Sequence, residues 1–174
     1  MKNSKIDKRS RLIDAANKLI QQHGFNQTSL ADIALESGVP LGNMYYYFKT
    51  KEELGHALIE HRTCGYQDQL SVWDQLLEPR QRILAAIKAV TSNREMLAQS
   101  GCPIGTLCQE LHKEGGPLAD KAASTFSVFL SWLETQFRKL GEGKASADHA
   151  LHLLSALQGA GLLTHAFNDP TLMV

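Results

Sequence analysis

Apolar side chains recur at intervals of three or four residues along almost the whole chain. Near the N-terminus they are Leu12, Ile13, Ala16, Leu19 and Ile20, and in the last part of the chain they are Leu151, Leu154, Leu157 and Leu162. This spacing places them on one face of an α-helix, whereas a half-exposed strand would alternate apolar and polar residues. Breaks fall at 78–79, 101–103, 115–117 and 141–143. We therefore predict an all-α protein of about eight amphipathic helices.

Glycine and capping residues divide the N-terminal part of this pattern. A helix over about 7–23 and a second over about 29–37 are each followed by a glycine, which is the residue that most readily ends a helix. The second helix begins with Ser29 and Asp32, whose spacing is that of two side chains that cap the first free N–H groups. A longer helix beginning at Thr50 has the same spacing, with Glu53 three residues later.

A third, short helix is expected over about 41–48, separated from the second by a tight turn. Two short helices joined in this way have the length of a helix-turn-helix, in which the second helix enters the major groove of DNA. Met44 and Phe48 would hold this helix inward, so no more than one of Tyr45, Tyr46 and Tyr47 can be buried beside them. Exposed tyrosine hydroxyls suit contacts to phosphate oxygens.

The charge distribution is consistent with a nucleic-acid partner only locally. The chain has 18 Lys and Arg and 18 Asp and Glu, but six basic residues face two acidic ones within the first 18 positions. The basic residues are Lys2, Lys5, Lys8, Arg9, Arg11 and Lys18. Such an arm is typical either of a solvated tail or of a segment that neutralises phosphates.

The run from Gly24 to Leu54 resembles the N-terminal domain of TetR-type transcriptional regulators, most specifically in Tyr45-Tyr46-Tyr47-Phe48 followed by Lys51 and Leu54. The resemblance implies a homodimeric repressor that binds double-stranded, palindromic operator DNA and is released by a small-molecule effector. It divides the chain into a DNA-binding domain over 1–54 and a helical effector-binding and dimerisation domain over 55–174. Family members usually continue into a further C-terminal helix, so a chain ending at Val174 implies a truncated product or a reduced interface.

Ten residues are expected at the DNA. By this resemblance Leu41, Gly42 and Asn43 would approach the bases, since a small or polar start of the helix lets the backbone come close to DNA and the amide of Asn43 can pair with a base edge. The others would contact phosphates: Thr28, Ser29, Tyr45, Tyr46, Tyr47, Lys49 and Lys51. Family members often carry histidine at the position of Tyr47, which makes its role less secure.

The effector site is inferred only from residue type. Bulky or soft side chains suit the wall of an apolar cavity, and a few polar groups would orient the ligand. The candidates are Trp73, Met96, Phe126, Phe129, Trp132 and Phe167, with Cys102, His152 and Gln158 beside them. Most of these side chains are expected to be ordinary core.

Cys102 supports an alternative means of regulation. Pro103 suits the first position of a helix, which places Cys102 at the N-cap, where the helix dipole favours a thiolate. The same scaffold would then be switched by oxidants or electrophiles. Cys108 falls on an apolar face and is expected to be a small core residue.

Other classes are disfavoured by the sequence. Pairs such as His149 and His152, or His56 and His61, have no third ligand at a suitable spacing, so we expect neither a metal site nor a cofactor. No catalytic motif appears, which argues against an enzyme. No apolar stretch is long enough to span a membrane, no leader is recognisable and the three cysteines are odd in number, so a cytoplasmic location is expected. A helical protein-interaction module without DNA binding remains as an alternative of another class.

Overall fold

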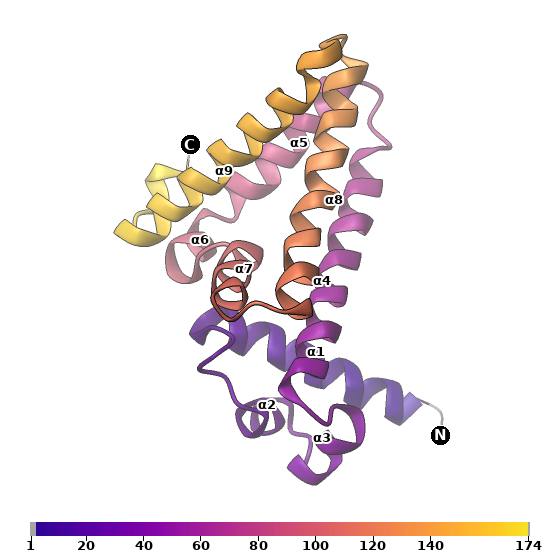
Figure 1. Ribbon diagram of the computed structural model, residues 1–174, viewed down its shortest axis with the longest axis vertical. Coiled ribbons are helices and arrows are strands. Elements are labelled where there is room, and N and C mark those ends of the chain that lie inside the picture. Colours follow the sequence, from indigo (N-terminus) through magenta and orange to yellow (C-terminus); the bar gives the residue numbers. More distant parts are fainter. Residues whose placement is uncertain (1–2, 174) are drawn as a thin grey trace. The chain divides into compact units, whose positions relative to one another are not determined.

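A computed structural model describes residues 3–173, and over these residues the chain forms nine α-helices, two short 3-10 helices and no strand (Figure 1). The predicted all-α class is confirmed, and the expectation of about eight helices is close. The elements are α1 (Asn3–His23), α2 (Leu30–Ser37), α3 (Leu41–Tyr47), α4 (Lys51–Trp73), α5 (Pro79–Ser92), α6 (Arg94–Ser100), α7 (Pro103–Glu114), α8 (Pro117–Lys139), η1 (Gly143–Ala145), α9 (Ser146–Phe167) and η2 (Pro170–Leu172). Lys2 and the side chain of Lys5 lie outside the described part.

The predicted capping of α2 is confirmed. The backbone N–H of Asp32 donates to the Ser29 hydroxyl at 3.1 Å, and the Asp32 carboxylate accepts from the backbone N–H of Ser29 at 2.9 Å. At the start of α4, only one of the two capping hydrogen bonds predicted between Thr50 and Glu53 is formed. The N–H of Glu53 donates to the Thr50 hydroxyl at 3.0 Å, but the Glu53 carboxylate bonds the N–H of Lys49, one residue before the predicted partner.

The chain divides into two compact units, and each is discontinuous in sequence. Unit 1 contains Met1–Arg62 and Thr106–Ala122, and unit 2 contains Thr63–Gly105 and Ala123–Val174. Helices α4, α7 and α8 therefore contribute residues to both units. The predicted boundary between residues 54 and 55 concerns the division of functions, and it stays a prediction.

The core of unit 1 combines residues from distant parts of the sequence. Leu12, Ile33 and Met44 from the first three helices are fully buried, and they belong to one cluster with Leu107 and Leu111 of α7. A group of three helices, two of which have only eight and seven residues, buries little apolar surface by itself. The later segment supplies the remaining apolar contacts that the N-terminal helices need.

The core of unit 2 is rich in aromatic rings. Trp73 and Trp132 lie with ring centroids 5.6 Å apart, and the ring of Phe129 stacks on Trp132 at 6.1 Å. These rings belong to one cluster with the fully buried Leu133 and with Leu154 of α9. Both tryptophans of the chain thus lie in unit 2.

The expected apolar face of α9 needs a correction. Leu154 and Leu157 are buried, but Leu151 and Leu162 are more than half exposed. Leu157 and Leu162 are five residues apart, which separates them by about 140° around a helix of 3.6 residues per turn. One face of α9 therefore enters the core of unit 2, while leucines elsewhere on its circumference remain uncovered.

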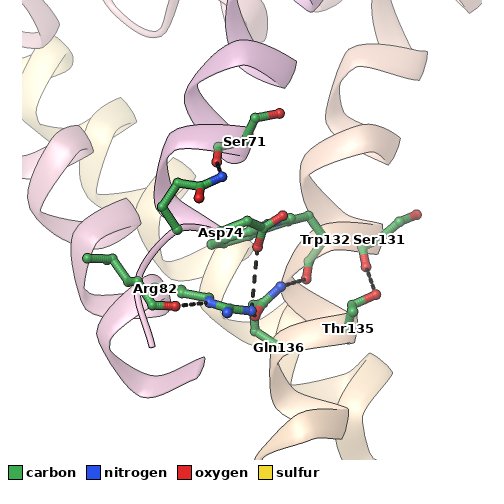
Figure 2. A network of polar contacts seen from close by, with 9 residues as sticks. Ser71, Asp74, Arg82, Ser131, Trp132, Thr135 and Gln136 are labelled. Atoms are coloured by element: carbon green, nitrogen blue, oxygen red, sulfur yellow. Dashed lines mark hydrogen bonds and ion pairs between the residues drawn. The ribbon is translucent and has the colours of Figure 1, made fainter. Parts of the chain in front are cut away.

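A polar network fastens the segment after α4 to α5 and α8 within unit 2 (Figure 2). The indole N–H of Trp132 donates to the Asp74 carboxylate at 3.1 Å. Arg82 donates to the backbone carbonyl of Leu76 at 2.8 Å and to the buried amide oxygen of Gln136 at 3.3 Å. Because buried polar groups are costly unless they are hydrogen-bonded, this network fixes the turn between α4 and α5.

Candidate nucleic-acid interface

Helix α3 is anchored by the two side chains that the sequence predicts to face inward. Met44 is 0% exposed and Phe48, at the C-terminal cap, is 3% exposed. Tyr47 is partly buried and packs against the same core cluster. Its ring meets that of Tyr46 edge-on at 5.1 Å. The prediction that no more than one of the three tyrosines turns inward is thus confirmed.

The opposite side of α3 is presented to solvent. Tyr45 and Tyr46 are 49% and 69% exposed, which is unusual for side chains with so much apolar surface. The exposed residues at the beginning of the helix are Leu41, Gly42 and Asn43. A methyl group added at Gly42 would have no neighbour within 4 Å, so nothing within the chain requires glycine at this position.

The turn between α2 and α3 depends on a side chain from α1. The guanidinium of Arg11 donates to the backbone carbonyl of Ser37 in the last turn of α2. Gly38 follows with φ of +64°, and a Cβ at that position would lie 2.8 Å from the Arg11 guanidinium. The left-handed backbone favours glycine here, and a larger residue would also displace the Arg11 guanidinium.

Other basic side chains of α1 also have partners within unit 1. The Arg9 guanidinium lies 5.5 Å from the ring centroid of Phe48, a cation–π contact at the end of α3. Lys18 forms an ion pair with Glu36 of α2. The sequence does not reveal these intramolecular contacts, because an excess of basic residues does not identify the partner of each one.

The two hydroxyl residues before α2 differ in exposure. Ser29 is exposed, and its hydrogen bonds to Asp32 hold the pKa of that carboxyl below its ordinary value. Thr28 is only 3% exposed, and its hydroxyl donates to the carbonyl of Gly24 at 2.8 Å. This bond stabilises the turn after α1, so the geometry favours a structural role for the Thr28 side chain. Its contact with phosphate stays a prediction.

The two lysines after α3 also differ. Lys49 is exposed. The ammonium of Lys51 donates to the carbonyl of Asn26 at 3.1 Å and lies 4.7 Å from the ring centroid of Phe25. Burial lowers the pKa of Lys51, and the nearby carboxylates of Glu110 and Glu114 act in the opposite direction. The Lys51 side chain therefore contacts other groups of the protein, whereas the Lys49 side chain is exposed to solvent.

The structure separates the candidate effector residues into groups. Trp73, Phe126, Phe129 and Trp132 belong to the aromatic cluster of unit 2, whereas Met96 and Cys102 pack against a smaller cluster with Leu97 and Leu157. His152 is exposed and Phe167 is 69% exposed, so neither side chain lies in the core, and their part in effector binding stays a prediction. Gln158 is partly buried, with its amide oxygen beside Gly105.

Cys102 occupies the predicted position at the beginning of α7. Helix α7 begins at Pro103, and the Cys102 sulfur accepts a hydrogen bond from the backbone N–H of Gly105 at 3.4 Å. A Cβ at Gly105 would lie 3.3 Å from the Cβ of Cys102 and 3.1 Å from the amide oxygen of Gln158. Cys108 is partly buried against the core of unit 1, as its apolar position predicts.

A hollow of about 270 Å³ lies elsewhere, between α1 and α2 in unit 1. Its lining residues are Leu19, His23, Gln27, Thr28, Asp32, Leu35 and Glu36. None of the candidate effector residues contributes to it. Over residues 3–173, no three His, Cys, Asp or Glu side chains come together as metal ligands, and no helix has the length and apolar character needed to cross a membrane.

These features define the class. The order of helices, the tight glycine turn, the buried anchors of α3 and its exposed outer face are those of a helix-turn-helix DNA-binding protein. Residues 12–58 match the family model of bacterial regulatory proteins of the tetR family. The chain is 30% identical to the HTH-type transcriptional regulator YxaF of Bacillus subtilis strain 168, over 97% of this chain and 90% of that protein. The chain belongs to the TetR family of transcriptional regulators.

Three further comparisons agree with the assignment. The chain is 30% identical to the HTH-type transcriptional repressor NemR of Escherichia coli strain K12, over 71% of this chain and 61% of that protein. A TetR transcriptional regulator from Legionella pneumophila has the same fold, with a TM-score of 0.85 at 24% identity, covering 99% of this chain and 92% of that chain. The reduced form of E. coli NemR superposes with a TM-score of 0.82 at 21% identity, covering 95% and 91%. The chain is thus a DNA-binding transcriptional regulator, not an enzyme.

Proposed function

We propose that this regulator is a repressor that binds a palindromic operator as a homodimer and leaves it when an apolar or aromatic small molecule binds. Residues 1–54 would bind DNA, and residues 55–174 would bind the effector and form the dimer. The observation that carries the DNA-binding part is the outer face of α3, where Tyr45 and Tyr46 are exposed while Met44 is completely buried. Side chains at the beginning of α3 would read base edges, and the tyrosines and Lys49 would contact phosphates.

The proposed homodimer rests on the exposed apolar side chains of α9. An apolar surface of this kind on one helix is typical of a protein–protein interface. The residues are Leu151, Leu162, Leu163 and Phe167. A two-fold dimer would place its two copies of α3 in successive major grooves, which lie about 34–36 Å apart along B-DNA. The operator would then consist of two inverted half-sites.

The proposed effector class rests on the residues that unit 2 encloses. Trp73, Phe129 and Trp132 form an apolar, aromatic interior that a flat apolar molecule would complement. The rings are in mutual contact, so a ligand would bind by favouring a more open arrangement of the surrounding helices. Release from DNA follows if that arrangement is one in which the two α3 helices no longer match the groove spacing.

A second mode of control is favoured by the contact at Cys102. The Cys102 sulfur accepts a hydrogen bond from the backbone N–H of Gly105 at the beginning of α7, and a thiol is the group that electrophiles and oxidants modify. The similarity to NemR, one structure of which is of the reduced form, adds to the case. Cys102→Ser should then abolish release from DNA by a quinone. Release of this variant at the wild-type dose would remove the thiol from the mechanism.

The experiment that tests the proposal is selection of bound duplexes from a random DNA pool, followed by fluorescence anisotropy of the enriched duplex as a function of salt. Enrichment of an inverted repeat, bound with one dimer per duplex in sedimentation, is the expected result. The logarithm of the affinity should fall linearly with the logarithm of the salt concentration, because phosphate contacts release counterions. If no duplex is enriched at low salt, the proposed interface is wrong, and the protein-interaction module becomes the better explanation of the tyrosines.

A further inference from the structure

The turn between α1 and α2 is held by a side chain from a distant part of the sequence. The carboxylate of Glu110, on α7, accepts a hydrogen bond from the backbone N–H of Asn26 at 3.0 Å. The two residues are 84 positions apart, and both belong to unit 1. Backbone groups in an exposed turn are normally satisfied by water, so a carboxylate that reaches one from another helix constrains the turn.

Gly24 makes this approach possible. Its φ of +86° is a conformation that glycine adopts readily and other residues avoid. A Cβ at this position would lie 2.7 and 3.0 Å from the two carboxylate oxygens of Glu110. The glycine therefore provides the space in which the carboxylate meets the backbone.

A second charged group holds the carbonyl of the same residue. The ammonium of Lys51, at the start of α4, donates to the carbonyl oxygen of Asn26 at 3.1 Å, and it also lies over the Phe25 ring. Burial lowers the pKa of this lysine, and the carboxylates of Glu114 and Glu110 both act in the opposite direction. The N–H and the C=O of Asn26 are thus bound by opposite charges from two helices, and charge-assisted hydrogen bonds are the stronger kind.

The restrained turn leads directly into the helix-turn-helix. Two residues after Asn26, the Thr28 hydroxyl donates to the carbonyl of Gly24, and Ser29 then caps α2. Phe25 is buried in the core of unit 1, and a Cβ at Gly55 of α4 would lie 3.1 Å from its ring. The position of residues 24–26 consequently sets where α2 begins, and α2 supports α3 through the Gly38 turn.

We propose that Glu110 is a positioning residue for DNA binding: its carboxylate fixes the Gly24–Asn26 turn so that α2 and α3 are presented in the geometry that fits the groove. The proposal rests on the DNA interface proposed above. A purely electrostatic role makes the opposite prediction. If Glu110 acted only as a negative charge, its removal would strengthen binding to every DNA sequence, because one source of repulsion from phosphates would be lost.

Three substitutions at Glu110 distinguish the position of its carboxylate oxygens from its negative charge. Glu110→Gln keeps the length and an oxygen acceptor but loses the charge, Glu110→Asp keeps the charge but withdraws the oxygens by one methylene, and Glu110→Ala loses both. Glu114→Gln is the matched control for charge, because it removes a negative charge one turn further along the same helix, and that charge acts on Lys51 as the charge of Glu110 does. For each variant we would measure the affinity for the selected duplex by anisotropy at fixed salt, and amide hydrogen exchange over residues 24–29.

The positioning role predicts that Glu110→Ala and Glu110→Asp bind the duplex about three- to tenfold more weakly, the loss expected for one or part of one charge-assisted hydrogen bond. In both, the Asn26 amide should exchange at least about tenfold faster. Glu110→Gln keeps an oxygen acceptor without the charge, so it should weaken binding by only about two- to threefold, less than Glu110→Ala, whereas Glu114→Gln should stay within about twofold of the unmodified protein in both measurements. If Glu110→Ala does not fold, Glu110→Asp and Glu110→Gln still distinguish the two roles, because the first keeps the charge and the second keeps the length of the side chain.

Two results would overturn the proposal. Wild-type affinity and exchange in Glu110→Asp, with tighter binding by both Glu110→Gln and Glu114→Gln, would show that only the charge matters. Faster exchange at Asn26 with unchanged DNA affinity would show that the turn is held but that its position is irrelevant to DNA. If the unmodified protein binds no duplex at all, the proposed interface itself fails. That result is distinct, because the exchange measurement still reports whether Glu110 holds the turn.

Discussion

Unit 1 and unit 2 use their polar and apolar side chains in opposite ways. In unit 1, charged groups reach between helices to fix backbone turns, as Arg11 does at Ser37 and Glu110 at Asn26, while tyrosines are left exposed on α3. In unit 2, the aromatic rings are packed together and leucines remain uncovered on α9. A surface that meets a rigid duplex must be displayed and fixed in advance. The proposed effector site in unit 2 instead has the packing of ordinary core.

The largest expected effect tests whether the aromatic cluster of unit 2 behaves as core. Leu133 is fully buried within it, so Leu133→Ala should lower the free energy of unfolding by about 2–5 kcal/mol through lost burial and a residual cavity. Because both tryptophans lie in unit 2, tryptophan fluorescence during urea unfolding reports on this unit. The matched control is Leu162→Ala, on the exposed part of α9, which should change the unfolding of the monomer by less than about 0.5 kcal/mol.

A small loss for Leu133→Ala would indicate that the cluster is loosely packed and already resembles an open pocket. A large loss for Leu162→Ala that grows with protein concentration would indicate that α9 is covered by a second copy. Either result would weaken the contrast between unit 1, which exposes tyrosines on α3, and unit 2, which packs its aromatic rings together.

The next prediction concerns Gly42, at the beginning of α3. Because a Cβ there meets nothing within 4 Å, Gly42→Ala should stabilise the free protein by up to about 1 kcal/mol, the helix preference of alanine over glycine. If the backbone of α3 approaches DNA closely, the same methyl group should weaken operator binding by about 1–3 kcal/mol, or roughly five- to hundredfold. Thermal unfolding and anisotropy measure the two quantities.

Gly65, in the part of α4 that belongs to unit 2, provides the control. It is exposed, and a Cβ there also meets nothing within 4 Å. Gly65→Ala should therefore stabilise the protein equally and leave DNA binding unchanged. Equal DNA affinity for both variants would mean that Gly42 does not approach the duplex.

A smaller effect is expected for the tyrosine hydroxyls. Tyr46→Phe keeps the ring and removes only the oxygen, so loss of one hydrogen bond to phosphate should weaken binding roughly two- to tenfold for every DNA sequence alike. Tyr66→Phe is the counterpart in unit 2, where the ring lies edge-on to Phe129 at 6.4 Å, and it should not change DNA binding. Anisotropy with the selected duplex and with an unrelated one distinguishes a phosphate contact from base recognition. A loss confined to the selected duplex would assign Tyr46 to the bases.

The part of the structure that the sequence predicts well is governed by local interactions. The cap at Ser29, the inward pair Met44 and Phe48, and the beginning of α7 at Pro103 each depend on residues within one or two helical turns. Spacing alone therefore predicts them. The same locality explains why the outer face of α3 could be identified without a structure.

The interactions that the sequence does not predict are long-range. Glu110 lies 84 residues from Asn26, and Arg11 lies 26 residues from Ser37, so nothing in their immediate sequence marks either contact. Aromatic residue type did not predict burial, as Trp73 and Phe167 show by their opposite exposure. The one available signal was a glycine at each meeting point, Gly24 and Gly38, because a glycine in a turn leaves room for a side chain from elsewhere.

The smallest expected effect compares two carboxyl groups that cap helices, one in each unit. Hydrogen bonds from Ser29 lower the pKa of Asp32 in unit 1, and those from Thr171 lower the pKa of Asp169 in unit 2. A carboxyl whose pKa is lower in the folded state stabilises fully above its unfolded pKa of about 4, and this contribution disappears as the pH falls through the folded value. We would measure the urea midpoints of the unmodified protein, Asp32→Asn and Asp169→Asn from about pH 6 to about pH 2.5. The midpoint of the unmodified protein should exceed that of each variant most at about pH 6, and the difference should shrink below about pH 4. Tryptophan fluorescence follows unit 2, and circular dichroism follows the helices of both. If Asp32→Asn shifts both signals together, the two units unfold as one, whereas a shift in circular dichroism alone would show that unit 1 opens independently.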